Sequence, residues 1–62
     1  MKKPVCKLVG QNGNIYNLIG LAAKALIKNG QNDKADEMKG RVFGAMSYSD
    51  ALCIIMEYVE VR

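Results

Sequence analysis

Hydrophobic residues change their spacing along the chain, and each spacing predicts a different element. Residues 4–10 (PVCKLVG) alternate, with Cys6 and Leu8 on one side and their neighbours on the other. This alternation is typical of a short strand, and Pro4 at its start indicates an edge strand. Residues 11–14 (QNGN) predict a turn, because Asn and Gly tolerate a positive φ.

From Ile15 the hydrophobic spacing becomes that of a helix. Asn14 is the expected N-cap, because its side-chain oxygen can accept from a free amide of the first turn. Gly30, directly after Asn29, predicts a helix stop in the left-handed conformation. One apolar stripe comprises Ile15, Leu18, Ile19, Ala22, Ala25 and Leu26. A second apolar flank comprises Tyr16, Leu21, Ala23 and Ile27.

Residues 31–46 predict a second helix, with Asn32 or Asp33 as its cap. Its apolar set is thin, and Gly40 in its interior costs about 1 kcal/mol relative to Ala. Residues 47–59 predict a third helix, capped by Ser47 or Ser49 and apolar around most of its circumference. Such a segment is expected at the centre of the fold.

The last residues, YVEVR, return to a period of two and predict a C-terminal strand over 58–61. We expect it to pair with residues 5–9, because a lone strand would leave its backbone groups unpaired. The predicted fold class is α+β, mainly α, in the order β-α-α-α-β, with residues 1–62 forming one domain. The expected core is Val5, Leu8, Ile15, Leu18, Ile19, Ala22, Leu26, Met38, Val42, Leu52, Ile55 and Val59.

Size and composition suggest a partner. The chain has 62 residues, of which half are hydrophobic and four are aromatic. A domain this small buries only about 60% of the surface that its unfolded chain exposes. One core therefore has no room for both flanks of the first helix. We expect Tyr16, Leu21, Ala23 and Ile27 to form a protein-interaction surface, used in a homodimer or in docking on a larger partner.

Charge supports an alternative function. The net charge is +3, and basic residues are mixed with acidic ones in the middle of the chain. The alternative is a nucleic-acid-associated accessory protein of a phage or mobile element that binds phosphates without reading sequence. Its phosphate contacts would be Lys24, Lys28, Lys39 and Arg41. Sequence readout is not expected, because residues 50–59 carry no Arg, Lys, Asn or Gln to read base edges.

Enzymatic chemistry is not expected. The chain has no histidine, which removes the usual general base and most zinc sites. The glycine-rich loop after residue 9 has Asn12 and Ile15 where a dinucleotide fingerprint needs glycines, and it has no P-loop lysine. It is interpreted as a turn, although amides at a helix N-terminus can attract an anion. We therefore expect no catalytic residue, cofactor, metal or small-molecule substrate.

The compartment is expected to be the cytoplasm. Cys6 and Cys53 match no paired motif and are expected to be reduced. The N-terminal residues lack the apolar stretch and cleavage site of a signal peptide. No run approaches the roughly 18 apolar residues of a membrane span, so no membrane association is expected.

Two motifs resemble those of a family of very small bacterial proteins that are often found in prophages and other mobile elements. The family has a V-G-x-[ND]-G-N-x-[YF]-x-L-x-G start and a Y-V-E-V-like end. The resemblance covers most of the chain and is weakest in the middle helix. It implies a bacterial or phage intracellular origin and no catalytic or ligand residue. The matching residues are Val9, Gly10, Asn12, Gly13, Asn14, Tyr16, Leu18, Gly20 and Tyr58 to Val61.

Overall fold

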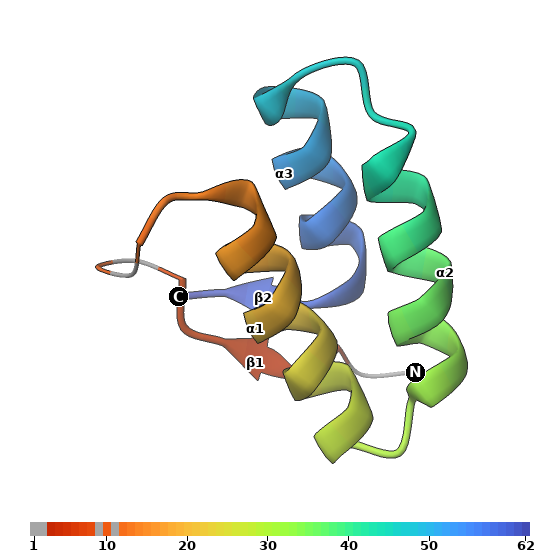
Figure 1. Cartoon of the computed structure of the whole chain (residues 1–62). Coiled ribbons are helices and arrows are strands. Elements are labelled where there is room, and N and C mark those ends of the chain that lie inside the picture. Colours follow the sequence, from red (N-terminus) through yellow and green to blue (C-terminus); the bar gives the residue numbers. More distant parts are fainter. Residues whose placement is uncertain (1–2, 9, 11) are drawn as a thin grey trace.

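Three helices and two short strands follow one another in the order that the hydrophobic pattern predicts (Figure 1). The computed structural model describes residues 3–8, 10 and 12–62. Val9 and Gln11, which the predicted strand and turn include, lie outside the described residues. The mainly α fold class with a small sheet is thus confirmed. The elements are β1 (Val5–Cys6), α1 (Ile15–Lys28), α2 (Asn32–Phe43), α3 (Tyr48–Tyr58) and β2 (Glu60–Val61).

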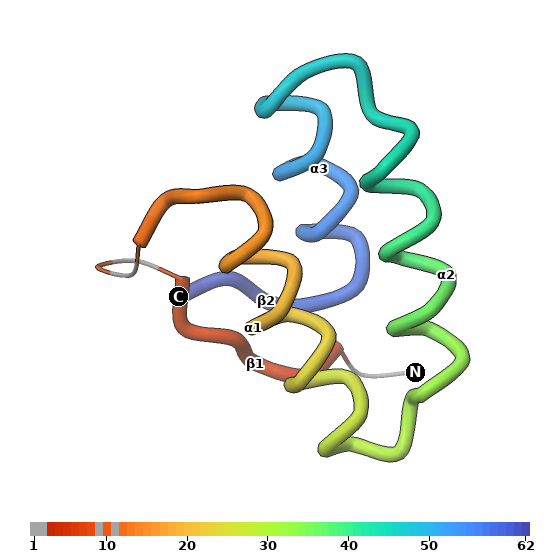
Figure 2. The backbone as a smooth tube through the Cα atoms, in the orientation of Figure 1, coloured from red at the N-terminus to blue at the C-terminus, as the bar shows by residue number. Residues whose placement is uncertain are grey.

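The helices form an up-and-down arrangement in which α2 packs against both α1 and α3. Figure 2 shows the tight turn from α1 into α2 at the bottom and the looser connection from α2 into α3 at the top. β1 packs against α1, and β2 follows directly from α3. The core lies between the three helices and the sheet, and its largest fully buried side chains are those of Leu26, Met38, Ile55 and Val59.

The two ends of the chain pair as a parallel sheet, with Val5 opposite Glu60 and Cys6 opposite Val61. The amide of Glu60 donates to the carbonyl of Pro4 at 2.8 Å, and the amide of Arg62 donates to that of Cys6 at 3.0 Å. The amide of Leu8 donates back to Arg62 at 2.7 Å. These bonds give β1 the backbone partners that it would otherwise lack. The predicted pairing of the ends is confirmed.

The caps of α1 and α3 are those expected. The Asn14 side chain accepts from the amide of Tyr16 at 2.9 Å, and the Ser47 hydroxyl accepts from the amide of Asp50 at 3.1 Å. At the end of α1, the amides of Gly30 and Gln31 donate to the carbonyls of Ile27 and Leu26. This pair of bonds is a Schellman motif, and Gly30 has the positive φ of 75° that it requires.

The second helix differs from its prediction at both ends. It begins at Asn32, so Gln31 occupies the N-cap position, and no side chain makes the capping bond expected of Asn32 or Asp33. It stops at Phe43, with Gly44 as its C-cap, instead of continuing to Met46. The last buried residue within this helix is Val42, and Gly44 follows Phe43 directly as the C-cap.

Most of the expected core is buried, and Val5 is the clear error. Its side chain is 51% exposed, because the strand alternates and it is Cys6 and Leu8 that face the core. Ile15 and Leu52 pack against the core while only partly buried. Further buried residues, absent from the expected core, are Cys6, Ala23, Ala35, Ala51 and Tyr58.

In the turn before α1 the positive φ lies at Gly10, whereas the Asn-Gly pair of the QNGN turn predicts it at Gly13. Among the described residues, a positive φ occurs at Gly10 (84°) and Gly30, and at no other residue type. A Cβ at Gly13 would meet the Tyr48 hydroxyl at an ordinary contact distance of 3.5 Å. The left-handed backbone conformation therefore lies at Gly10, at the start of the loop.

Gly10→Ala is expected to lower the free energy of unfolding by about 1–2 kcal/mol, because the left-handed conformation penalises a Cβ. Gly13→Ala is the matched control and should change the same quantity by less than about 0.5 kcal/mol. Urea unfolding followed by circular dichroism gives both values. An equal loss in the two variants would contradict the assignment.

Removing residues 60–62 is expected to lower the free energy of unfolding by about 2–4 kcal/mol, although chain ends are usually dispensable. The truncation removes backbone bonds worth about 1 kcal/mol each and leaves β1 unpaired. Arg62→Gln keeps the backbone and should unfold like the wild type. Unprotected amides at Glu60 and Arg62 in hydrogen exchange of the intact chain would contradict the role of the sheet.

Candidate functional site

The four residues expected to form an interaction surface do not share one. Ala23 is only 4% exposed and belongs to the core, and Leu21 is half-buried against that core. Tyr16 and Ile27 are exposed. Leu21 follows Tyr16 by five residues, which places it about 140° around the helix. The expected surface is therefore wrong in Ala23, and Leu21 lies on a different side of α1 from Tyr16.

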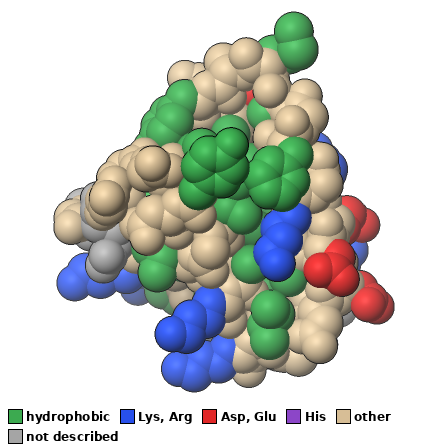
Figure 3. Space-filling view, in the orientation of Figure 1, with side chains coloured by type: hydrophobic (Ala, Val, Ile, Leu, Met, Phe, Trp, Pro, Cys, Tyr) green, Lys and Arg blue, Asp and Glu red, His purple; other side chains and the backbone are tan. Residues whose placement is uncertain are grey.

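A different set of large hydrophobic side chains gathers at one end of the molecule. We call Tyr16, Phe43, Met46 and Tyr48 the aromatic surface. Tyr16 is 70% exposed, Phe43 65% and Met46 91%. The Tyr16 and Phe43 rings have centroids 6.3 Å apart and are tilted by 39°. Figure 3 shows hydrophobic side chains gathered over the upper part of α1 and α2.

A solvent-open cavity of about 270 Å³ lies within the aromatic surface. The four members of the surface line it, and its walls combine apolar and polar area. A cavity of about 150 Å³ can hold benzene, so this one has room for a large apolar side chain. Its remaining lining residues are Ile15, Ile19, Val42, Ala45, Ser47 and Ala51.

Local hydrogen bonds fix the position of this surface. Tyr48 is the first residue of α3, directly after the Ser47 cap. Its hydroxyl donates to the carbonyl of Gly13, which ties the start of α3 to the loop before α1. Asn14, in that same loop, caps α1, and Tyr16 is the second residue of that helix. The rims of the cavity thus come from capped helix ends.

The sequence pattern gave only a weak indication of this surface. Phe43 and Met46 are large apolar residues on a segment whose inner stripe is already complete with Ala35, Met38 and Val42. That excess is the one signal that could have marked them as exposed. Tyr48 is 47% exposed even though it has helical spacing with the residues that follow.

The candidate phosphate contacts divide into two groups. Lys24 and Lys28 are exposed on α1, and Lys39 is half-buried on α2, one turn before Phe43. Arg41 lies on the other side of α2, where it meets α3. Figure 3 shows basic side chains between α1 and α2 and below the aromatic surface, while acidic side chains gather on the outer edge of α2.

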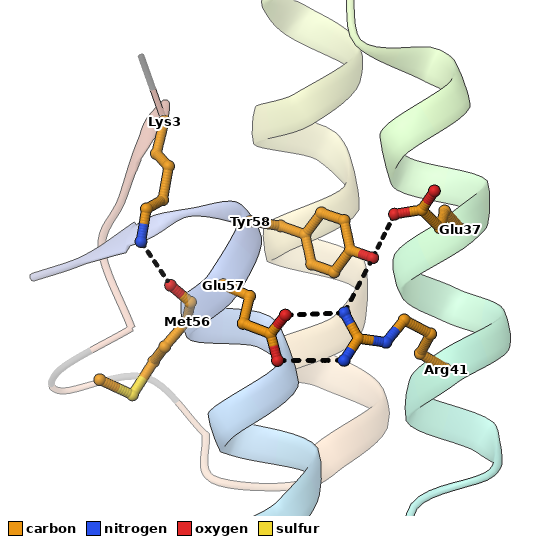
Figure 4. Close-up of polar contacts among 6 residues, drawn as sticks. All are labelled: Lys3, Glu37, Arg41, Met56, Glu57 and Tyr58. Atoms are coloured by element: carbon orange, nitrogen blue, oxygen red, sulfur yellow. Dashed lines mark hydrogen bonds and ion pairs between the residues drawn. The ribbon is translucent and has the colours of Figure 1, made fainter. Parts of the chain in front are cut away.

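Arg41 is held in a polar network (Figure 4). Its two terminal nitrogens donate to the two carboxylate oxygens of Glu57 at 2.8 and 3.0 Å. It also donates to the Tyr58 hydroxyl, which in turn donates to Glu37. The hydrogen bonds that Arg41 donates to Glu57 and then to Tyr58 raise the pKa of Arg41, and the bond from Arg41 lowers the pKa of Glu57. The network joins α2 to α3.

The loop over residues 12–14 uses its polar groups internally. The Asn12 side chain accepts from the amide of Asn14 at 2.9 Å, and the Asn17 side chain donates to the carbonyl of Asn12 at 2.9 Å. With the Asn14 cap, these bonds engage polar groups that surround the first turn of α1. This arrangement supports the interpretation as a turn.

The described part of the chain offers little reactive chemistry. Within residues 3–8, 10 and 12–62, no group of three or more His, Cys, Asp or Glu side chains could hold a metal ion. Burial raises the pKa of the Cys6 thiol and so disfavours the thiolate. The arrangement can bind through the aromatic surface.

Comparison of the chain with protein-family models, curated proteins and solved structures gives no significant match. The resemblance to small prophage proteins and the cytoplasmic location therefore stay predictions. None of the helices in the described residues is sufficiently long and apolar to cross a membrane.

The Arg41–Glu57 pair predicts a loss of stability in acid. The folded protein lowers the pKa of Glu57 from its ordinary value of 4.5, so the pair stabilises the fold above that pH and is lost as the pH falls through the lowered value. The melting temperature of Glu57→Gln should consequently fall less than that of the wild type between about pH 5 and pH 3. Glu60→Gln, which keeps the Arg41 pair, should follow the wild type. Identical acid profiles for all three proteins would contradict this role.

Proposed function

We propose that this protein is a small protein-interaction module whose docking face is the aromatic surface. The observation that supports the proposal is the gathering of four large, exposed hydrophobic side chains around one cavity. Single exposed hydrophobic residues are normal, whereas a contiguous group marks an interaction site. Aromatic residues and Met are also enriched at the centres of protein interfaces.

The nucleic-acid alternative has less support. Arg41, the residue best suited to hold a phosphate, is already bound by a bidentate carboxylate. Of the three lysines that remain, Lys39 and Lys24 lie about one and two turns from the aromatic surface, and Met46 in that surface has no use in a phosphate site. Their position fits a polar rim around an apolar docking face.

The proposal is tested by weakening the aromatic surface without disturbing the fold. Phe43→Ser with Met46→Ser removes two exposed side chains, so unfolding should change by less than about 0.5 kcal/mol. Met56→Ser is the matched control, because Met56 is an exposed Met on α3 outside the aromatic surface.

The measurement is quantitative capture from extracts of the cells that encode the protein, together with sedimentation of each variant. Proteins retained by the wild type and by Met56→Ser should be lost from the double variant by about tenfold or more. The proposal is wrong if the double variant retains the same proteins and sediments in the same oligomeric state as the wild type.

A further inference from the structure

The lysines and the aromatic surface form one continuous face. Tyr16 and Phe43 touch at the start of α1 and the end of α2, and the two helices run in opposite directions (Figure 2). Lys24 on α1 and Lys39 on α2 therefore lie in the same direction from the Tyr16–Phe43 pair. With a rise of 1.5 Å per residue, Lys39 lies about 6 Å and Lys24 about 12 Å from the aromatic pair along the axes.

Lys39 is half-buried on α2, four residues before Phe43 and so on the same side of that helix. Lys28 lies one turn beyond Lys24 on α1, further around the helix from Tyr16. Acidic side chains on this side of the molecule lie on the outer edge of α2, away from the seam (Figure 3). The face is therefore apolar at the aromatic surface, and at its other end basic residues lie beside the exposed Ile27.

This charge distribution disfavours a second copy as the occupant. A standard interface covers about 800 Å² on each partner, roughly a fifth of the 4161 Å² surface of this chain. A symmetric dimer built on the aromatic surface would have to extend over the adjacent lysines. If the twofold axis ran along the seam, Lys24 and Lys39 of both copies would approach each other, and in any arrangement each chain, with a net charge of +3, would meet an equally charged copy.

We propose that the seam between α1 and α2 binds an acidic amphipathic helix of another protein. An apolar side chain of that helix fills the cavity between Phe43, Met46 and Tyr48, as in other helix-in-groove complexes. Carboxylates one and two turns further along pair with Lys39 and Lys24, which complement their charge. This inference rests on the proposed function and adds the class of partner to it.

The test uses synthetic helices and the full chain. The acidic probe is a labelled amphipathic peptide of about 18 residues, long enough to form a helix, with a Leu and Phe stripe flanked by Glu. A neutral probe has Gln in place of each Glu. Fluorescence anisotropy of the label gives the affinity, and amide shifts of the protein locate the contact at Tyr16, Phe43 and Met46.

The acidic probe is expected to bind at least about tenfold more tightly than the neutral one and to weaken as salt rises from about 50 to 500 mM. Lys39→Glu should weaken the acidic probe by about tenfold, whereas Lys34→Glu, with the same change of charge on the opposite side of α2, should not. Lys24→Glu gives the same test at a fully exposed position, in case Lys39→Glu perturbs the fold.

Each contrary outcome has a distinct meaning. Equal affinity for both probes, abolished by Phe43→Ser with Met46→Ser, would overturn the acidic partner and keep the docking face. Binding of the acidic probe that survives this double variant would overturn both proposals. If oligothymidine binds through Lys24 and Lys39 more tightly than the acidic probe does, the partner is a nucleic acid and not a helix. A dimer that the acidic probe does not dissociate would show that the partner is a second copy of the chain. Failure of both probes to bind would refute the proposal of an acidic helix.

Discussion

Pairing of the two chain ends is the constraint on which the rest of the fold depends. β1 is very short, and its described backbone bonds reach β2 and the residue after it. Without that partner, Cys6 and Leu8 would not be held against the core, and one side of α1 would be uncovered. The three helices between the strands supply the long crossover that this parallel pair needs.

The helix α2 has different neighbours on its two sides, and this decides where the candidate site lies. On the α3 side, Arg41 is bound to Glu57 and Tyr58, so its charge is satisfied within the fold. On the α1 side, Phe43 is 65% exposed, and the ion pairs found among the described residues do not include Lys39. An exposed ion pair contributes little stability, so the network matters mainly for holding α2 at a fixed angle to α3.

Small size explains why large hydrophobic side chains remain at the surface. The fully buried positions of the core include Ala22 and Ala35, where helices approach closely and no larger residue would fit. Close approach fills the interior with few side chains and leaves Phe43 and Met46 outside it. The protein therefore carries its candidate docking face at the point where α2 ends and the chain leaves the core.

Local chemistry in the sequence determined the helices and their limits. Asn14, Ser47 and Gly30 act through bonds to backbone groups a few residues away, so their roles can be predicted without knowing the fold. Hydrophobic periodicity likewise identified most of the core. Tertiary structure decided which of two apolar flanks is covered: packing of α2 on α1 buried Ala23 and left Tyr16 and Phe43 exposed. It also placed the positive φ at Gly10 and ended α2 at Phe43, because both depend on where distant elements hold the chain.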